Sequence, residues 1–121
     1  MMIKCITLIQ PWCSLINDGK KKIETRSWAT KHRGLLGIHA GMKVDKDASI
    51  RFGYDPRTII RGHVLCTCLL IECVQFPNLL IKSDPYGDFT AGRWGWILND
   101  IKPLPEPIPM KGGLSLWNLD L

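Results

Sequence analysis

The chain has 121 residues and a formal net charge of +5; 45% of its residues are hydrophobic and 22% are charged. A chain of this length makes one domain, and this balance argues against wholesale disorder, a coiled coil or a collagen-like fibre. The charge is uneven, because residues 1–61 hold 12 Lys or Arg and 5 Asp or Glu, whereas residues 62–121 hold 4 and 6. A basic half suggests an acidic partner such as nucleic acid or a nucleotide phosphate, although it also serves ordinary solubility.

The first half of the chain predicts short strands and two short helices. Residues 4–9 are rich in β-branched side chains and stop before a proline, which is typical of a strand. A helix is predicted over residues 11–18, because Pro11 suits the first helical position and Gly19 the position after the last. Further strands are expected over residues 22–26 and 34–40, and a second helix over residues 44–52.

The second half predicts strands and loop. Residues 62–74 form the longest strand candidate and are expected at the centre of a sheet, and residues 76–90 read mainly as loop. A strand is predicted over residues 93–98. The proline-rich segment 104–110 can only be an edge strand or an extended cover, because proline cannot donate a ladder hydrogen bond. A short last strand is expected around Trp117. The predicted fold is mixed and mainly β: a compact, partly closed β-barrel of five or six strands with two or more short helices.

No segment predicts a membrane span or a leader. The longest apolar stretch, residues 64–74, is far shorter than the ~20 residues that cross a bilayer. The first residues lack the long apolar core of a signal peptide. We therefore expect a single domain over residues 1–121 that works in the cytoplasm and has no membrane partner.

The cysteines and histidines do not predict a metal site. The five cysteines form no Cys-x-x-Cys pair, and the three histidines have no metal-ligand spacing. The cysteines are expected to pack as small hydrophobic side chains in a reducing compartment. We expect no structural metal and no cofactor.

The segment from Gly19 to Trp28 carries the densest set of reactive side chains. On a strand, Glu24 and Arg26 share one face and can form an ion pair, and Lys21 can swing from the preceding turn towards the same pocket. Crowded lysines can become nucleophilic or basic. The alternative is a solvated basic turn with a surface ion pair that adds little stability. As a turn residue, Lys21 is expected to contribute little packing.

Three further side chains are candidates with two interpretations each. Trp28 lies among basic residues and could stack on a base or anchor the core. Trp94 shares a strand face with Trp96 and could stack on a base, a contact worth roughly 1–3 kcal/mol, or pack in the core. His39 could face a cleft or the core.

The order of the motifs resembles the ASCH domain family, which has the PUA-like fold. The resemblance begins with Gln10-Pro11-Trp12 and continues with the Gly-x-Lys-x-x-Glu-x-Arg segment that ends at Arg26. It goes on through Arg33-Gly34 and Ile38-His39-Ala40. The late motifs are Gly92-Arg93-Trp94-Gly95-Trp96, Pro107-Ile108-Pro109 and Leu116-Trp117. The series covers nearly the whole chain.

The resemblance implies a barrel with a cleft beside the first helix, lined by Lys21, Glu24 and Arg26, with Gln10 and Trp12 nearby. It implies binding of nucleic acid, RNA above DNA, or of a nucleotide or a modified base. We expect phosphate or a base carbonyl to meet the cationic side chains, an exocyclic amine to meet Glu24, and a base to lie on a tryptophan. The expected ligand-binding residues are Gln10, Trp12, Lys21, Glu24, Arg26, Trp28, Arg33, His39 and Trp94.

The alternative is a small hydrolase that acts on a modified nucleoside or on RNA, because some family members are amidohydrolases of acetylated cytidine or are linked to ribonuclease activity. Lys21 and Glu24 would then be catalytic. The amidohydrolase pattern has a threonine three residues after the lysine, where this chain has Glu24. Thr25 is expected on the opposite strand face. The pattern also has a later glutamate, for which this chain offers only Asp84 and Asp88.

Overall fold

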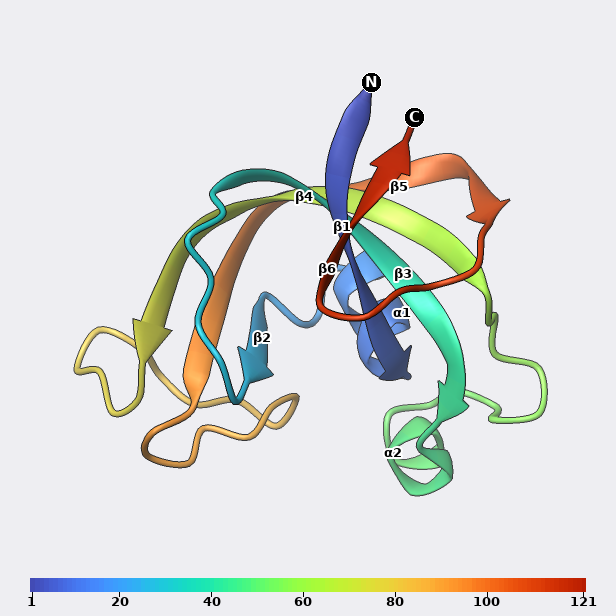
Figure 1. Ribbon diagram of the computed structural model, residues 1–121. Coiled ribbons are helices and arrows are strands. Elements are labelled where there is room, and N and C mark those ends of the chain that lie inside the picture. Colours follow the sequence, from blue (N-terminus) through green and yellow to red (C-terminus); the bar gives the residue numbers. More distant parts are fainter.

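The computed structural model describes residues 1–121 as six strands and two short helices (Figure 1). The mainly β class with short helices is therefore confirmed. Neither six-residue helix has the length or the apolar character that a membrane span requires. In chain order the elements are β1 (Met2–Gln10), α1 (Trp12–Asn17), β2 (Ile23–Arg26), β3 (Gly34–Val44), α2 (Lys46–Arg51), β4 (His63–Gln75), β5 (Trp94–Pro109) and β6 (Leu116–Asp120).

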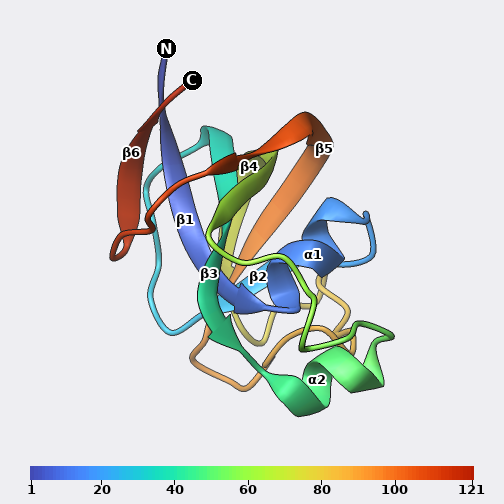
Figure 2. The ribbon, with the colours of Figure 1, turned by 90° about the vertical axis from the view of Figure 1, so that its right-hand side faces the viewer.

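The six strands form one sheet in the order β2-β5-β4-β3-β1-β6. Strands β1 and β3 run parallel, and every other neighbouring pair runs antiparallel. The sheet curves strongly, as Figures 1 and 2 show, but its edge strands β2 and β6 do not pair with each other. The expected barrel is thus an open one, because β2 has only four residues and pairs with β5 alone.

Helix α1 packs inside the curve of the sheet, against β1, β3, β4 and β5 (Figure 1). Leu15 and Ile16 are fully buried, and Trp12 at the start of the helix is half-buried. Gly19 has a φ of 77°, a left-handed conformation that glycine adopts without strain. This turn ends the helix and directs the chain into β2, so the start of β2 lies next to α1.

Strand β5 corrects the prediction for residues 93–110. The two expected segments form a single strand, Trp94–Pro109. Its first residues, 94–97, pair with β2 on one side and with β4 on the other, and its later half pairs with β4 alone. The prolines therefore lie at a free edge, where a missing N–H group costs no ladder bond.

The segment between β4 and β5 folds back across β2. Its base is closed by backbone hydrogen bonds between Phe76 and Arg93 and between Gly92 and Phe76. Its tip reaches β2, where the Asp88 N–H donates to Thr25 Oγ1 over 3.0 Å. Opposite this tip lies α2, which is capped by Asp45, whose carboxylate accepts from the Ala48 N–H. The tip and α2 form two walls of the site.

Candidate functional site

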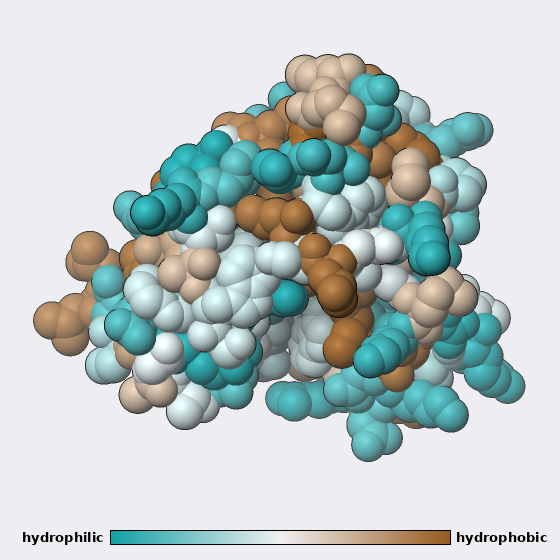
Figure 3. Space-filling model, in the orientation of Figure 1, coloured by the Kyte–Doolittle hydropathy of each residue, from teal (hydrophilic) through white to brown (hydrophobic).

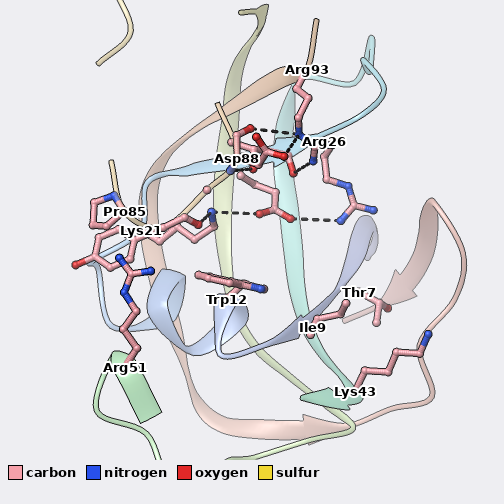
Figure 4. Close-up of a pocket in the computed structure, with 14 residues that line it drawn as sticks. Thr7, Ile9, Trp12, Lys21, Arg26, Lys43, Arg51, Pro85, Asp88 and Arg93 are labelled. Carbon is pink, nitrogen blue, oxygen red and sulfur yellow. Dashed lines mark hydrogen bonds and ion pairs between the residues drawn. The ribbon is translucent and has the colours of Figure 1, made fainter. Parts of the chain in front are cut away.

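A hollow with a volume of about 650 Å³ opens on the face shown in Figure 3, between the tip of the β4–β5 segment and α2. Hydrophilic side chains gather on both of its sides. We call it the central pocket. Its lining residues come from β1, α1, the α1–β2 turn, β2, β3, α2 and the β4–β5 segment, and Figure 4 draws them: Thr7, Ile9, Trp12, Lys21, Glu24, Thr25, Arg26, Lys43, Arg51, Pro85, Tyr86, Gly87, Asp88 and Arg93.

A buried ion-pair network lies at the β2 wall of the central pocket (Figure 4). Lys21 Nζ is 3.4 Å from Glu24 Oε1, and Arg26 Nη1 is 3.3 Å from Glu24 Oε2. The carboxylate therefore bridges two cations. This confirms the prediction that Glu24 contacts Arg26 or Lys21 and that all three border one concave pocket.

The packing of Lys21 differs from the expectation for a turn residue. Its side chain is only 1% exposed, because Trp12 of α1 and Tyr86 of the β4–β5 segment close over it. The ammonium group donates to the Tyr86 carbonyl oxygen and lies 5.6 Å from the centre of the Trp12 ring. A buried ammonium needs such partners, since an uncompensated charge in the interior costs several kcal/mol. Lys21 is a packed residue of the β2 wall.

A second ion pair lies at the rim formed by the β4–β5 segment. Arg93 Nε is 3.5 Å from Asp88 Oδ2. Hydrogen bonds from the Thr90 side chain and backbone, together with the Arg93 charge, lower the pKa of Asp88, so this group is a carboxylate at neutral pH. Thr25 lines the same pocket, contrary to its expected position on the opposite face, because the loop tip packs against the β2 edge.

The central pocket is strongly basic. Five cationic and two anionic side chains line it, a local charge of +3: Lys21, Arg26, Lys43, Arg51 and Arg93 against Glu24 and Asp88. Four of the five cations come from residues 1–61, so part of the basic excess of that half gathers here. Other basic side chains of the same half, such as Lys31 and Arg57, lie outside the pocket. The site is suited to an anionic or electron-rich ligand.

Gln10 and Trp28 support the pocket without lining it. The buried Gln10 amide donates to Ser14 Oγ and to the Ile60 carbonyl oxygen, and its own oxygen accepts from the Ser14 N–H. It therefore holds the start of α1. Trp28 packs edge-on against Trp96, with ring centres 4.9 Å apart, and the Arg26 guanidinium lies 5.4 Å from its ring.

Three other predicted site residues lie outside the central pocket. Arg33 pairs with Glu72 over 3.0 Å. Trp94 is half-buried and packs against the core. His39 is buried, contacts Thr7 Oγ1 through Nδ1, and donates from Nε2 to the Met110 carbonyl oxygen. The structure thus brings together Trp12, Lys21, Glu24 and Arg26 and separates the rest.

Sequence reasoning missed the pocket residues of other elements. They are Thr7 and Ile9 of β1, Lys43 of β3, Arg51 of α2, and Tyr86 and Arg93 of the β4–β5 segment. One local signal existed in Gly87, where a Cβ atom would lie 2.7 Å from Thr25 Cγ2, so only glycine lets the loop approach β2 this closely. No cluster of three His, Cys, Asp or Glu side chains could hold a metal ion.

Comparisons with known proteins agree with this architecture. The chain is 29% identical to Activating signal cointegrator 1 from Homo sapiens and from Mus musculus, over alignments that cover 96% of this chain and 22% of each relative. It thus spans about a fifth of the length of these curated relatives. The crystal structure of ASCH from Zymomonas mobilis superposes with a TM-score of 0.62 at 18% identity, covering 97% of this chain and 87% of that one. The ASCH domain matches residues 6–89. The chain therefore belongs to the ASCH domain family.

Proposed function

We propose that this ASCH domain binds RNA, a nucleotide or a modified base in the central pocket. The observation that carries the proposal is the combination of a local charge of +3 with a tryptophan face and a buried, ion-paired carboxylate in one hollow. Its volume of about 650 Å³ falls within the range of small-molecule sites. Such a pocket suits a single-stranded or flipped-out base better than a duplex.

Each group has a role in this proposal. Arg26, about a quarter exposed, offers free N–H donors to phosphate or to a base carbonyl. Glu24 has lone pairs beyond those that face its two cations and can accept from an exocyclic amine. Trp12, half-buried at the start of α1, offers a ring on which a base can stack.

The experiment is a thermal-shift screen against nucleosides, nucleotides and short RNA oligomers. A ligand at 100 times its dissociation constant stabilises the folded state by about 2.7 kcal/mol. We expect Arg26→Gln to abolish most of that shift. Arg33→Gln is a matched control, because Arg33 also pairs with a glutamate but lies outside the pocket. The proposal fails if no compound shifts the midpoint, or if both variants respond alike.

A second candidate function is hydrolysis of a modified nucleoside or of RNA. The observation that favours it is a buried ammonium, Lys21, held 3.4 Å from a carboxylate that faces the pocket. Such a pair can act in general acid–base chemistry. Asp88, one of the two carboxylates expected to replace a later glutamate, lines the same pocket. The residue three positions after Lys21 remains Glu24 rather than threonine.

Incubation with N4-acetylcytidine and with single-stranded RNA, followed by chromatography of the products, tests this candidate. We expect Glu24→Gln and Lys21→Met each to abolish turnover, while Arg33→Gln retains it. Absence of product with the unmodified protein refutes hydrolysis of these substrates. Turnover that survives Lys21→Met refutes the catalytic roles.

A further inference from the structure

Three cationic side chains around the central pocket have no anionic partner in the protein. Glu24 pairs with both Lys21 and Arg26, and Asp88 pairs with Arg93. Lys43, Arg51 and Lys111 are exposed and take part in none of the ion pairs of the chain. The paired groups lie at the β2 wall and at the rim formed by the β4–β5 segment, whereas Lys43, Arg51 and Lys111 belong to β3, α2 and the segment between β5 and β6. Unpaired cations on a concave surface attract phosphate.

Arg51 and Lys43 lie at opposite ends of the central pocket, with Trp12 between them (Figure 4). Arg51 is held in place by aromatic contacts, since its guanidinium lies 4.9 Å from the Phe52 ring centre. The Phe52 ring in turn packs against Tyr86, with centres 5.1 Å apart. This stacking leaves the five N–H donors of Arg51 free for a ligand. One phosphate cannot occupy both ends of the pocket.

A second hollow adjoins the central pocket at Thr7. Thr7 lines both the central pocket and a neighbouring hollow of about 430 Å³, which also includes His39, Gly112 and Lys111. A Cβ atom at Gly112 would lie 2.6 Å from Thr7 Oγ1, so glycine there brings the segment of Lys111 against β1. A chain-like ligand that leaves the central pocket beside Lys43 therefore meets a further cation, Lys111.

We propose that the site takes an internal segment of a single-stranded nucleic acid, whose backbone runs from Arg51 across the central pocket to Lys43 and on past Thr7 to Lys111. This inference rests on the proposed function and specifies its ligand. The base above Trp12 enters the pocket, and the phosphates on either side of that nucleotide meet Arg51 and Lys43. A nucleoside uses none of the three cations, and a mononucleotide reaches only one end.

The test uses fluorescence anisotropy with labelled hexanucleotides of RNA and of DNA, and competition by the four nucleoside monophosphates, each over a range of salt concentrations. We expect a hexanucleotide to bind more tightly than any mononucleotide. For single strands, the slope of log affinity against log salt is about −0.7 for each phosphate neutralised. Arg51→Gln, Lys43→Gln and Lys111→Gln should each reduce that slope by about 0.7 and weaken hexanucleotide binding several-fold.

Lys31→Gln is the matched control, because Lys31 is exposed, has no ion-pair partner and lies outside both hollows. Binding of the RNA hexanucleotide, the DNA hexanucleotide or both, with the expected slopes, supports the path. The comparison of the two also shows whether the site binds RNA, DNA or either. Mononucleotides that bind as tightly as hexanucleotides refute the path but leave the proposed function standing. Equal slopes for Lys31→Gln and the three path variants also refute it. If no probe binds at all, the path is refuted together with the binding of RNA or of nucleotides that the proposed function includes.

Discussion

Replacement of Glu24 by glutamine tests how much the ion-pair network at the β2 wall of the central pocket stabilises the protein. The amide has nearly the same shape but carries no charge, so it leaves Lys21, only 1% exposed, without a counter-ion. Removal of one partner of a buried ion pair typically costs about 3–5 kcal/mol. The lower end applies here, because Lys21 keeps the Tyr86 carbonyl oxygen and the Trp12 ring. Arg26, with 26% of its side chain exposed, can turn towards water.

We therefore expect Glu24→Gln to lower the free energy of unfolding by about 3 kcal/mol. For a domain of this size, this corresponds to a fall in the melting midpoint of about 12 °C. Urea and thermal denaturation at pH 7 measure both quantities. Glu72→Gln is the control, because Glu72 pairs with Arg33 at the surface, where such pairs contribute little. That variant should leave the midpoint almost unchanged.

The double variant Lys21→Met/Glu24→Gln completes the test. Removal of both charges leaves no unpaired ammonium in the interior, so the double variant should be more stable than Glu24→Gln alone. We expect a coupling free energy of about 2 kcal/mol from the double-mutant cycle. A cost below about 1 kcal/mol for Glu24→Gln, or simple additivity of the two substitutions, would refute the argument that Lys21 is a buried, compensated charge.

Three other substitutions or modifications test the fold around the site. Asp45→Ala removes the side-chain cap of α2 and should lower the free energy of unfolding, measured by urea denaturation, by about 1 kcal/mol. An unchanged urea midpoint would contradict the capping role. Gly95→Ala places a Cβ atom 2.7 Å from the Phe76 ring and should lower the free energy of unfolding by about 1–3 kcal/mol. If this clash is the cause, adding Phe76→Leu should restore part of the lost stability. At pH 8, Cys73 alone should react rapidly with a disulfide reagent in the folded protein. The other four thiols are buried. Burial raises the pKa of Cys5, Cys66 and Cys68 to about 12 and raises the pKa of Cys13 well above its usual value. Several fast thiols in the native state would contradict that burial.

Most elements of the fold could be predicted from the sequence, because the signals that specify them are local. Pro11 at the first position and Gly19 after the last predicted a helix over residues 11–18, close to the observed Trp12–Asn17. The apolar run of residues 62–74 predicted β4, which lies third in the six-stranded order. The ion pair of Glu24 with Arg26 was also predictable, since alternate residues of a strand share a face.

The course of β5 depended on a partner strand. Its sequence predicts a strand at each end, but continuity between them depends on β4, which pairs with both halves. The short β2 leaves the later half with a free edge, where its prolines are tolerated. The local sequence of β5 does not predict how far its neighbours β2 and β4 extend along it.

The tertiary structure alone decided the composition of the pocket. Lys43 of β3 and Arg51 of α2 lie far from Arg93 in the chain, and all three line one pocket with Glu24 only because the β4–β5 segment and α2 face each other across the open side of the sheet. The burial of Lys21 has the same origin, since Tyr86, 65 residues away, supplies the carbonyl oxygen that its ammonium group contacts. Helices and strands follow from neighbouring residues, whereas a site assembled from distant segments follows from how the folded chain packs.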